Sequence, residues 1–140
     1  MASNKNQKRR FTRFFVDWKA AVFFGQKPKE IVHKARICDI SLGGIGLLTE
    51  KSVTLGESYR IIMAIPSYDQ SGHRYVQGTY KVIDTFLSSN GEFKCGLEVQ
   101  DMDIQSKESL IWFLREESKR LEWVYSRESG NYEFVKEAYA

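Results

Sequence analysis

The feature that most constrains this chain is a series of short strand-like segments, spaced regularly and separated by turn residues. A hairpin is expected around Asn90-Gly91, and Gly25 and Pro28 mark another turn. Regular strands without intervening helices favour an antiparallel barrel or sandwich. Strands are expected over residues 15–24, 30–40, 58–65, 74–86 and 92–99. Residues 39–47 are expected to form a glycine-rich turn that leads into a further short strand.

Near the C-terminus the apolar period changes, and residues 106–122 are predicted to form one helix that covers the barrel. Asp103 or Ser106 is the expected cap. For the aromatic tail, residues 123–140, three alternatives are open: a hairpin that packs on the body, a helix that packs on the body, or a segment that binds a partner. The apolar stripe of the helix is formed by Leu110, Ile111, Phe113, Leu114 and Leu121.

A chain of 140 residues is the size of one domain. It has no run of about 18 apolar residues and no signal-peptide pattern, so we expect a cytosolic protein without a membrane span. Cys38 and Cys95 show no CxxC spacing, and His33 and His73 stand alone. We therefore expect no metal and no cofactor.

The positive charge is concentrated at the N-terminus. The net charge is +3, and the first thirteen residues contain five cations and no acid, so the remaining residues carry a net charge of −2. This distribution indicates a flexible basic arm over residues 1–13, ahead of a body over residues 14–122, and points to a local anionic partner. The five cations are Lys5, Lys8, Arg9, Arg10 and Arg13.

Two short motifs stand out. Arg9 and Arg13 form an RxxxR pair, and 26 residues after Arg13 the segment Asp39-Ile40-Ser41-Leu42-Gly43-Gly44 fits DxSxxG. Taken singly, the first is an ordinary solvated basic terminus and the second an ordinary turn. Their order and spacing, within a barrel followed by a helix, resemble the signature of the bacterial PilZ family over residues 8–122.

The resemblance implies a mainly β fold, a six-stranded antiparallel barrel with a C-terminal covering helix, and a receptor for cyclic di-GMP. Arg9 and Arg13 would grip guanine and phosphate, since a guanidinium can form paired hydrogen bonds and stack on a purine. Lys8 and Arg10 are possible helpers. The number of bound ligands is open. These additional cations would favour a stacked pair of ligands over a single one.

The second motif would supply base selectivity. The Asp39 carboxylate can accept hydrogen bonds from N1–H and N2–H₂ of guanine, a donor pair that adenine lacks. Ser41 can bond the base or a phosphate, and Gly44 lets the backbone approach the ligand. No direct role is assigned to Gly43 or Gly46.

The resemblance also implies a mechanism in which the arm becomes ordered on the ligand and signals to a protein partner. Catalysis is not expected, because the sequence shows no Ser/His/Asp arrangement, Walker loop or GxGxxG motif. Two alternatives remain open: a nucleic-acid-binding module that uses the arm, and an interaction adaptor that binds no ligand. The process that such a receptor controls is not readable from the chain.

Overall fold

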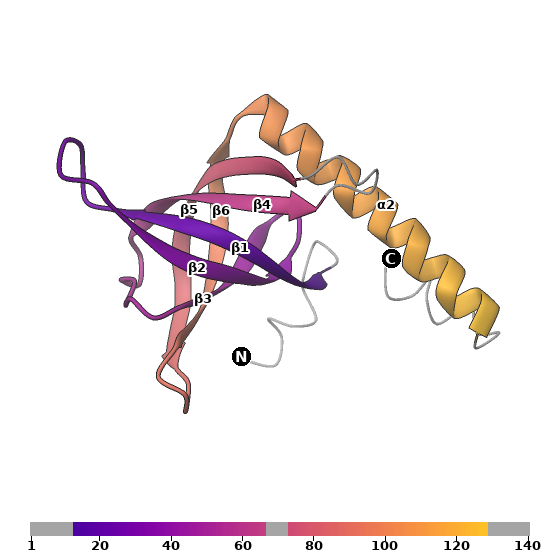
Figure 1. Ribbon diagram of the computed structural model, residues 1–140, viewed down its shortest axis with the longest axis horizontal. Coiled ribbons are helices and arrows are strands. Elements are labelled where there is room, and N and C mark those ends of the chain that lie inside the picture. Colours follow the sequence, from indigo (N-terminus) through magenta and orange to yellow (C-terminus); the bar gives the residue numbers. More distant parts are fainter. Residues whose placement is uncertain (1–12, 67–72, 129–140) are drawn as a thin grey trace.

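The computed structural model describes residues 13–66 and 73–128, and it shows six strands followed by one helix (Figure 1). All strand pairs are antiparallel, and the strands close into a barrel in the order β1-β2-β3-β6-β5-β4. The expected six-stranded barrel with a C-terminal helix is confirmed. The elements are β1 (Phe14–Phe24), β2 (Ile31–Ile40), β3 (Gly44–Thr49), β4 (Ser58–Pro66), β5 (His73–Leu87), β6 (Phe93–Met102) and α2 (Ile104–Glu128).

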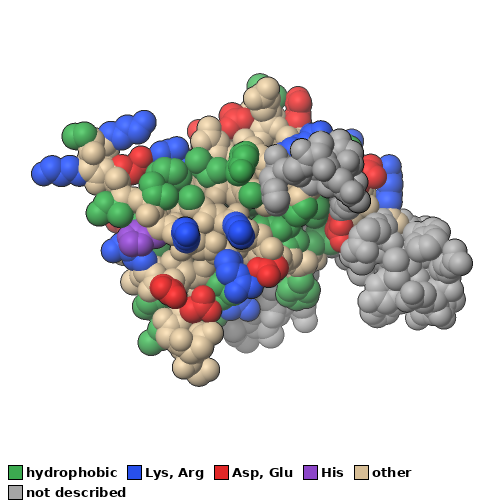
Figure 2. All heavy atoms as spheres, in the orientation of Figure 1, with side chains coloured by type: hydrophobic (Ala, Val, Ile, Leu, Met, Phe, Trp, Pro, Cys, Tyr) green, Lys and Arg blue, Asp and Glu red, His purple; other side chains and the backbone are tan. Residues whose placement is uncertain are grey.

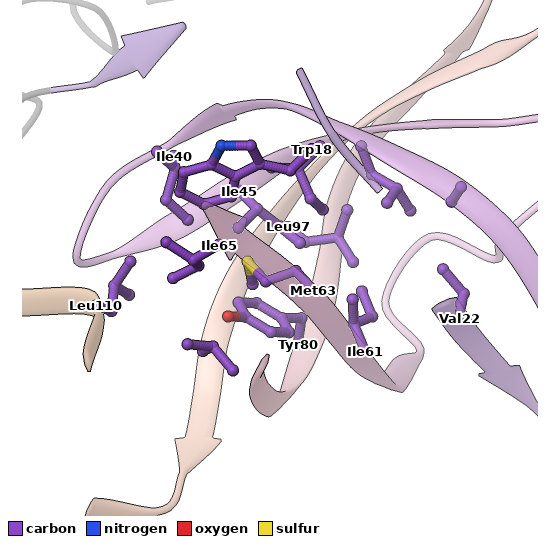
Figure 3. Close-up of a cluster of buried hydrophobic side chains, with 14 of the residues drawn as sticks. Trp18, Val22, Ile40, Ile45, Ile61, Met63, Ile65, Tyr80, Leu97 and Leu110 are labelled. Carbon is purple, nitrogen blue, oxygen red and sulfur yellow. The ribbon is translucent and has the colours of Figure 1, made fainter. Parts of the chain in front are cut away.

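The barrel interior is filled by aliphatic side chains that come from every strand. Ile45, Met63 and Leu97, from three different strands, converge in the centre of the core (Figure 3). The helix covers one end, where the Phe113 ring meets the Trp18 ring edge-on at a centroid distance of 4.8 Å. This packing removes the apolar face of α2 from water and explains why a single helix suffices to cap the barrel.

The hairpin between β5 and β6 lies where the sequence predicts it. The Ser88 amide donates to the Glu92 carbonyl, and the Gly91 amide donates to the Ser88 carbonyl. Gly91 has a φ of 87°, a left-handed conformation that glycine adopts without steric cost. The turn chemistry therefore helps to set the register of β5 and β6.

The predicted helix bounds, residues 106–122, are wrong at both ends. The helix begins at Ile104 because Asp103 is the cap: its carboxylate accepts from the Ser106 amide at 2.8 Å, which lowers the pKa of Asp103. At the other end no glycine or proline interrupts the chain before Gly130, and the helix continues to Glu128, past the end of the barrel (Figure 1). No helix in the described residues is both long and apolar enough to cross a bilayer.

A simple alternation of faces along residues 30–40 fails at one point. The sequence pattern places Ile37 and Asp39 on the same face, but the strand register shifts between them where β2 pairs with β3. Cys38 is the extra residue of this bulge, so Ile37 and Ile40 both point into the core. Asp39 pairs with Gly46, whose two neighbours on β3 face inward, and Asp39 therefore faces outward.

Tyr80 carries a hydroxyl into the core and generates a stability prediction. The side chain is 1% exposed, and its hydroxyl has no hydrogen-bond partner in the described part of the chain. Burial raises the pKa of Tyr80, so the group stays neutral. We expect Tyr80→Phe to raise the free energy of unfolding by about 1 kcal/mol, because it removes an unsatisfied buried hydroxyl. Denaturant unfolding measures the change.

Tyr59→Phe is the matched control. The Tyr59 hydroxyl accepts a hydrogen bond from the Thr54 amide at 2.9 Å, so its removal should lower stability or leave it unchanged. A loss of stability in Tyr80→Phe would show that the hydroxyl is satisfied after all.

Candidate functional site

A buried carboxylate lies at the centre of the site. Asp39 is 7% exposed, and its Oδ1 lies 3.8 Å from Nε of Arg13, close enough for an ion pair but too far for a hydrogen bond. Oδ1 accepts no hydrogen bond from the described residues. A buried acceptor of this kind is costly unless a donor reaches it, so the carboxylate suits a ligand that carries N–H groups.

The other carboxylate oxygen is contacted by the residue before it. Sγ of Cys38 lies 3.8 Å from Oδ2 of Asp39 as a weak donor. Burial, and secondarily the nearby Asp39 charge, raises the pKa of the Cys38 thiol. The thiol therefore stays protonated near neutral pH, which preserves its role as a donor and leaves Oδ1 as the oxygen with spare acceptor capacity.

Gly46 makes room for the carboxylate. A Cβ built on Gly46 would lie 2.2 Å from Oδ2 of Asp39, so no other residue type fits without moving Asp39. The sequence interpretation assigned Gly46 no direct role, and the structure assigns it this one. The available signal was the spacing: Gly44 and Gly46 are two apart and share a strand face.

Ser41 holds the turn between β2 and β3. Its Oγ accepts hydrogen bonds from the amides of Gly43 at 3.1 Å and Gly44 at 3.2 Å, and its own amide donates to the Gly44 carbonyl at 3.0 Å. The hydroxyl thus has a local structural role, in addition to the ligand contact that the sequence predicts. A contact between Ser41 and a base or phosphate stays a prediction.

The glycine at position 44 has a packing explanation. A Cβ there would lie 2.1 Å from the Leu97 carbonyl oxygen, because β3 and β6 approach closely at this point. Its φ is not positive, so backbone freedom is not the reason for the glycine. The expected role of Gly44 in ligand approach is a separate matter that this contact does not test.

The fold brings four of the seven predicted site residues into one region: Arg13, Asp39, Ser41 and Gly44. Arg13 directly precedes β1, and the following residues Phe14 and Phe15 pair with Ile40 and Asp39. Lys8, Arg9 and Arg10 lie outside the described residues. The sequence interpretation overlooked Phe15, which is 93% exposed and lies opposite Asp39.

Basic side chains also lie further along β1 and β2. Lys19 and Arg36 are exposed and pair across the two strands, and Lys34 is exposed two residues before Arg36. Several Lys and Arg side chains gather near the middle of the face that Figure 2 shows, with acidic side chains beside them. Arg36 also forms an ion pair with Asp17, which raises the pKa of Arg36. An excess of cations on one face raises the local concentration of an anionic ligand, even though exposed charges add little to stability.

A groove of about 500 Å³ lies elsewhere, between β5 and the first turns of α2. Tyr75, Gln77, Ser106 and Trp112 are among its lining residues. None of the four predicted site residues that the structure describes lines it, so the candidate site around Asp39 is an outer surface of the barrel and not this groove.

The sequence matches the family described as the PilZ domain over residues 7–116, which is more than half of the chain. The chain therefore belongs to the PilZ domain family. The matched region includes every residue of the two motifs described above. A search of curated proteins finds no match.

Solved structures share this fold at low sequence identity. Bacillus subtilis MotI (DgrA), an inhibitor of motility, superposes with a TM-score of 0.63 at 23% identity, over 79% of this chain and 52% of that one. The PilZ domain of Escherichia coli YcgR with c-di-GMP gives 0.53 at 16% identity, over 81% and 96%. The K. pneumonia MrkH–c-di-GMP complex gives 0.57 at 17% identity, over 81% and 54%. This chain thus spans about half the length of MotI and MrkH.

The hydrogen bonds of Ser41 predict a stability effect that is independent of any ligand. Ser41→Ala removes the acceptor of two amides and should lower the free energy of unfolding by about 1 kcal/mol. Ser52→Ala, at an exposed position between β3 and β4, is the control and should change it by less than about 0.5 kcal/mol. Denaturant unfolding of both variants makes the comparison, and equal effects would contradict the structural role of Ser41.

Proposed function

We propose that this chain is a receptor for cyclic di-GMP and binds it on the outer face of the barrel, around Arg13 and Asp39. The observation that carries the proposal is the buried Asp39 carboxylate, whose Oδ1 accepts no hydrogen bond from the described residues while a guanidinium lies beside it. Membership of the PilZ family supports it, as do the structures of YcgR and MrkH with c-di-GMP in the same fold.

The ligand chemistry matches these groups. The Watson–Crick edge of guanine presents N1–H and N2–H₂, two donors that a single carboxylate can accept together. Arginine complements the phosphates and the O6 and N7 acceptors of guanine. On binding, Asp39 would exchange its ion pair with Arg13 for the guanine edge, and Arg13 would turn to the ligand. Each group keeps a partner of opposite polarity in both states.

The basic arm extends this site in the proposal. Arg9 precedes Arg13 by four residues, so it reaches roughly 14 Å from it along an extended chain. Arg9 would contact guanine or phosphate, with Lys8 and Arg10 as helpers. Ordering of the arm over the ligand would change the exposed surface and create a contact for a protein partner.

The central prediction concerns Asp39. Calorimetric titration with cyclic di-GMP should show binding to the parent chain. Asp39→Ala should bind about 10- to 100-fold more weakly, the value of one bidentate base contact. Asp39→Asn should also lose affinity, because its NH₂ group would face one of the two guanine donors in place of an acceptor oxygen. Glu108→Ala, which removes an exposed acid at the groove beside α2 and away from Asp39, is the control and should bind as the parent does.

The outcomes separate three readings of the chain. Absence of binding by the parent would overturn the receptor and favour an adaptor. Undiminished binding by Asp39→Ala, or by Arg9→Ala, would overturn the corresponding site assignment and leave the function standing. Competition by an oligonucleotide with steep salt dependence, and indifference to cyclic di-AMP versus cyclic di-GMP, would indicate a nucleic-acid-binding module instead.

A second prediction tests whether the position of the carboxylate matters, as well as its charge. Gly46→Ala should weaken cyclic di-GMP binding about 10-fold or more, because its Cβ displaces Asp39, whose contact with the base is worth that much. Gly96→Ala is the matched control: its Cβ would lie 2.7 Å from Oδ1 of Asp84 on β5, so it displaces a different carboxylate.

Gly96→Ala should retain the parent's affinity. Thermal unfolding of both variants establishes that they are folded at the titration temperature. Equal losses in Gly46→Ala and Gly96→Ala would mean that strain in the sheet, and not displacement of Asp39, weakens binding.

A further inference from the structure

Phe15 is the most exposed large apolar side chain in the described residues, and its place in the strand register makes that exposure informative. It lies directly opposite Asp39 in the β1–β2 pairing. An isolated exposed apolar residue needs no explanation. An exposed aromatic ring beside a buried carboxylate with an unused acceptor is a different case, because a planar ligand can use both at once.

The two side chains share a face of the sheet. Phe14 is buried and pairs with the buried Ile40, so the next pair, Phe15 and Asp39, points outward. Residues that face each other directly across antiparallel strands have Cβ atoms about 4.5–5.5 Å apart. Arg13 also points to this face, as its ion pair with Asp39 shows. The ring and the guanidinium therefore flank the carboxylate along one strand.

We propose that Phe15 is a stacking platform for the guanine that Asp39 binds. The inference rests on the proposed function and deepens it. A guanine stacked flat on the Phe15 ring would reach across the spacing between β1 and β2. Its Watson–Crick edge would then place the N1–H and N2–H₂ donors at the Asp39 carboxylate. Stacking accepts any purine, whereas the carboxylate selects guanine. The two residues thus divide affinity and selectivity between them.

A different occupant of the ring would be an apolar side chain of the chain itself. Residues 1–12 contain one aromatic residue, Phe11, and are otherwise mostly polar or charged. Contact with Phe11 would need only apolar area, while a base needs a flat π face. Leucine supplies the first and not the second, and tyrosine supplies both.

Calorimetric titration of the full chain with cyclic di-GMP tests the proposal through three substitutions at this position. Phe15→Ala should bind about 10-fold more weakly, a typical loss when an aromatic stacking partner is removed. Phe15→Leu should show a similar loss, and Phe15→Tyr should bind as the parent does. Phe86→Ala, at an exposed phenylalanine on β5, is the matched control and should not change the affinity.

Proton NMR of the bound ligand gives a readout specific to stacking. A guanine H8 resonance should move upfield, by the ring current, with the parent and Phe15→Tyr but not with Phe15→Ala or Phe15→Leu. Parent-like affinity in Phe15→Ala, together with loss in Asp39→Ala, would overturn the platform and leave the receptor intact. Parent-like affinity in Phe15→Leu would assign the ring to apolar packing. Failure of the parent to bind would instead overturn the receptor.

Discussion

Strand β1 hydrogen-bonds to β2 on one side and to β4 on the other, and the rest of the structure depends on this double pairing. It closes the sheet, so that each of the six strands in the described residues has a neighbour on both sides, and it encloses the core that the helix then covers. It also sets the position of the residues at the start of β1. Because Phe14 pairs with Ile40, the residue before it, Arg13, is held near Asp39.

The electrostatics of the site follow from that position. An isolated carboxylate buried as deeply as Asp39 would be costly, and the nearby Arg13 guanidinium offsets part of this cost. At 3.8 Å and without a hydrogen bond from Nε, the pair is loose. A loose pair stabilises the buried carboxylate while leaving both groups available to a ligand that offers better geometry.

Much of the fold was predictable from the sequence, because strand alternation and turn residues are local signals. The hairpin at Gly91 and the Asp103 cap are examples. The predicted helix bounds failed at both ends, by two residues at Ile104 and by more at the C-terminal end, where the chain lacks an explicit stop before Gly130. The outward direction of Asp39 was not predictable, because it depends on a bulge at Cys38. A bulge moves every later residue to the other face, and no local propensity announces it.

The dependence on strand register also explains which site residues could not be predicted from the sequence. The motif residues are recognisable by type and spacing, whereas Gly46 and Phe15 matter through what lies across the strand from them. Gly46 is required by the carboxylate of Asp39, and Phe15 is defined by its pairing with that same residue. Cross-strand neighbours are a property of register, which is set by the whole barrel and not by any segment of it.

The two glycines of β3 have a consequence for how this surface can diverge. A side chain at position 44 would clash with the backbone of β6, and a side chain at position 46 would clash with Asp39. Single substitutions at these two positions are therefore not tolerated without moving a neighbour. Substitutions that change what this surface binds are therefore expected mainly at exposed positions around it. The start of β1 is the main one, because side chains there can change without disturbing the core. Related chains with the same two glycines should thus differ in their preferences mainly along that one edge.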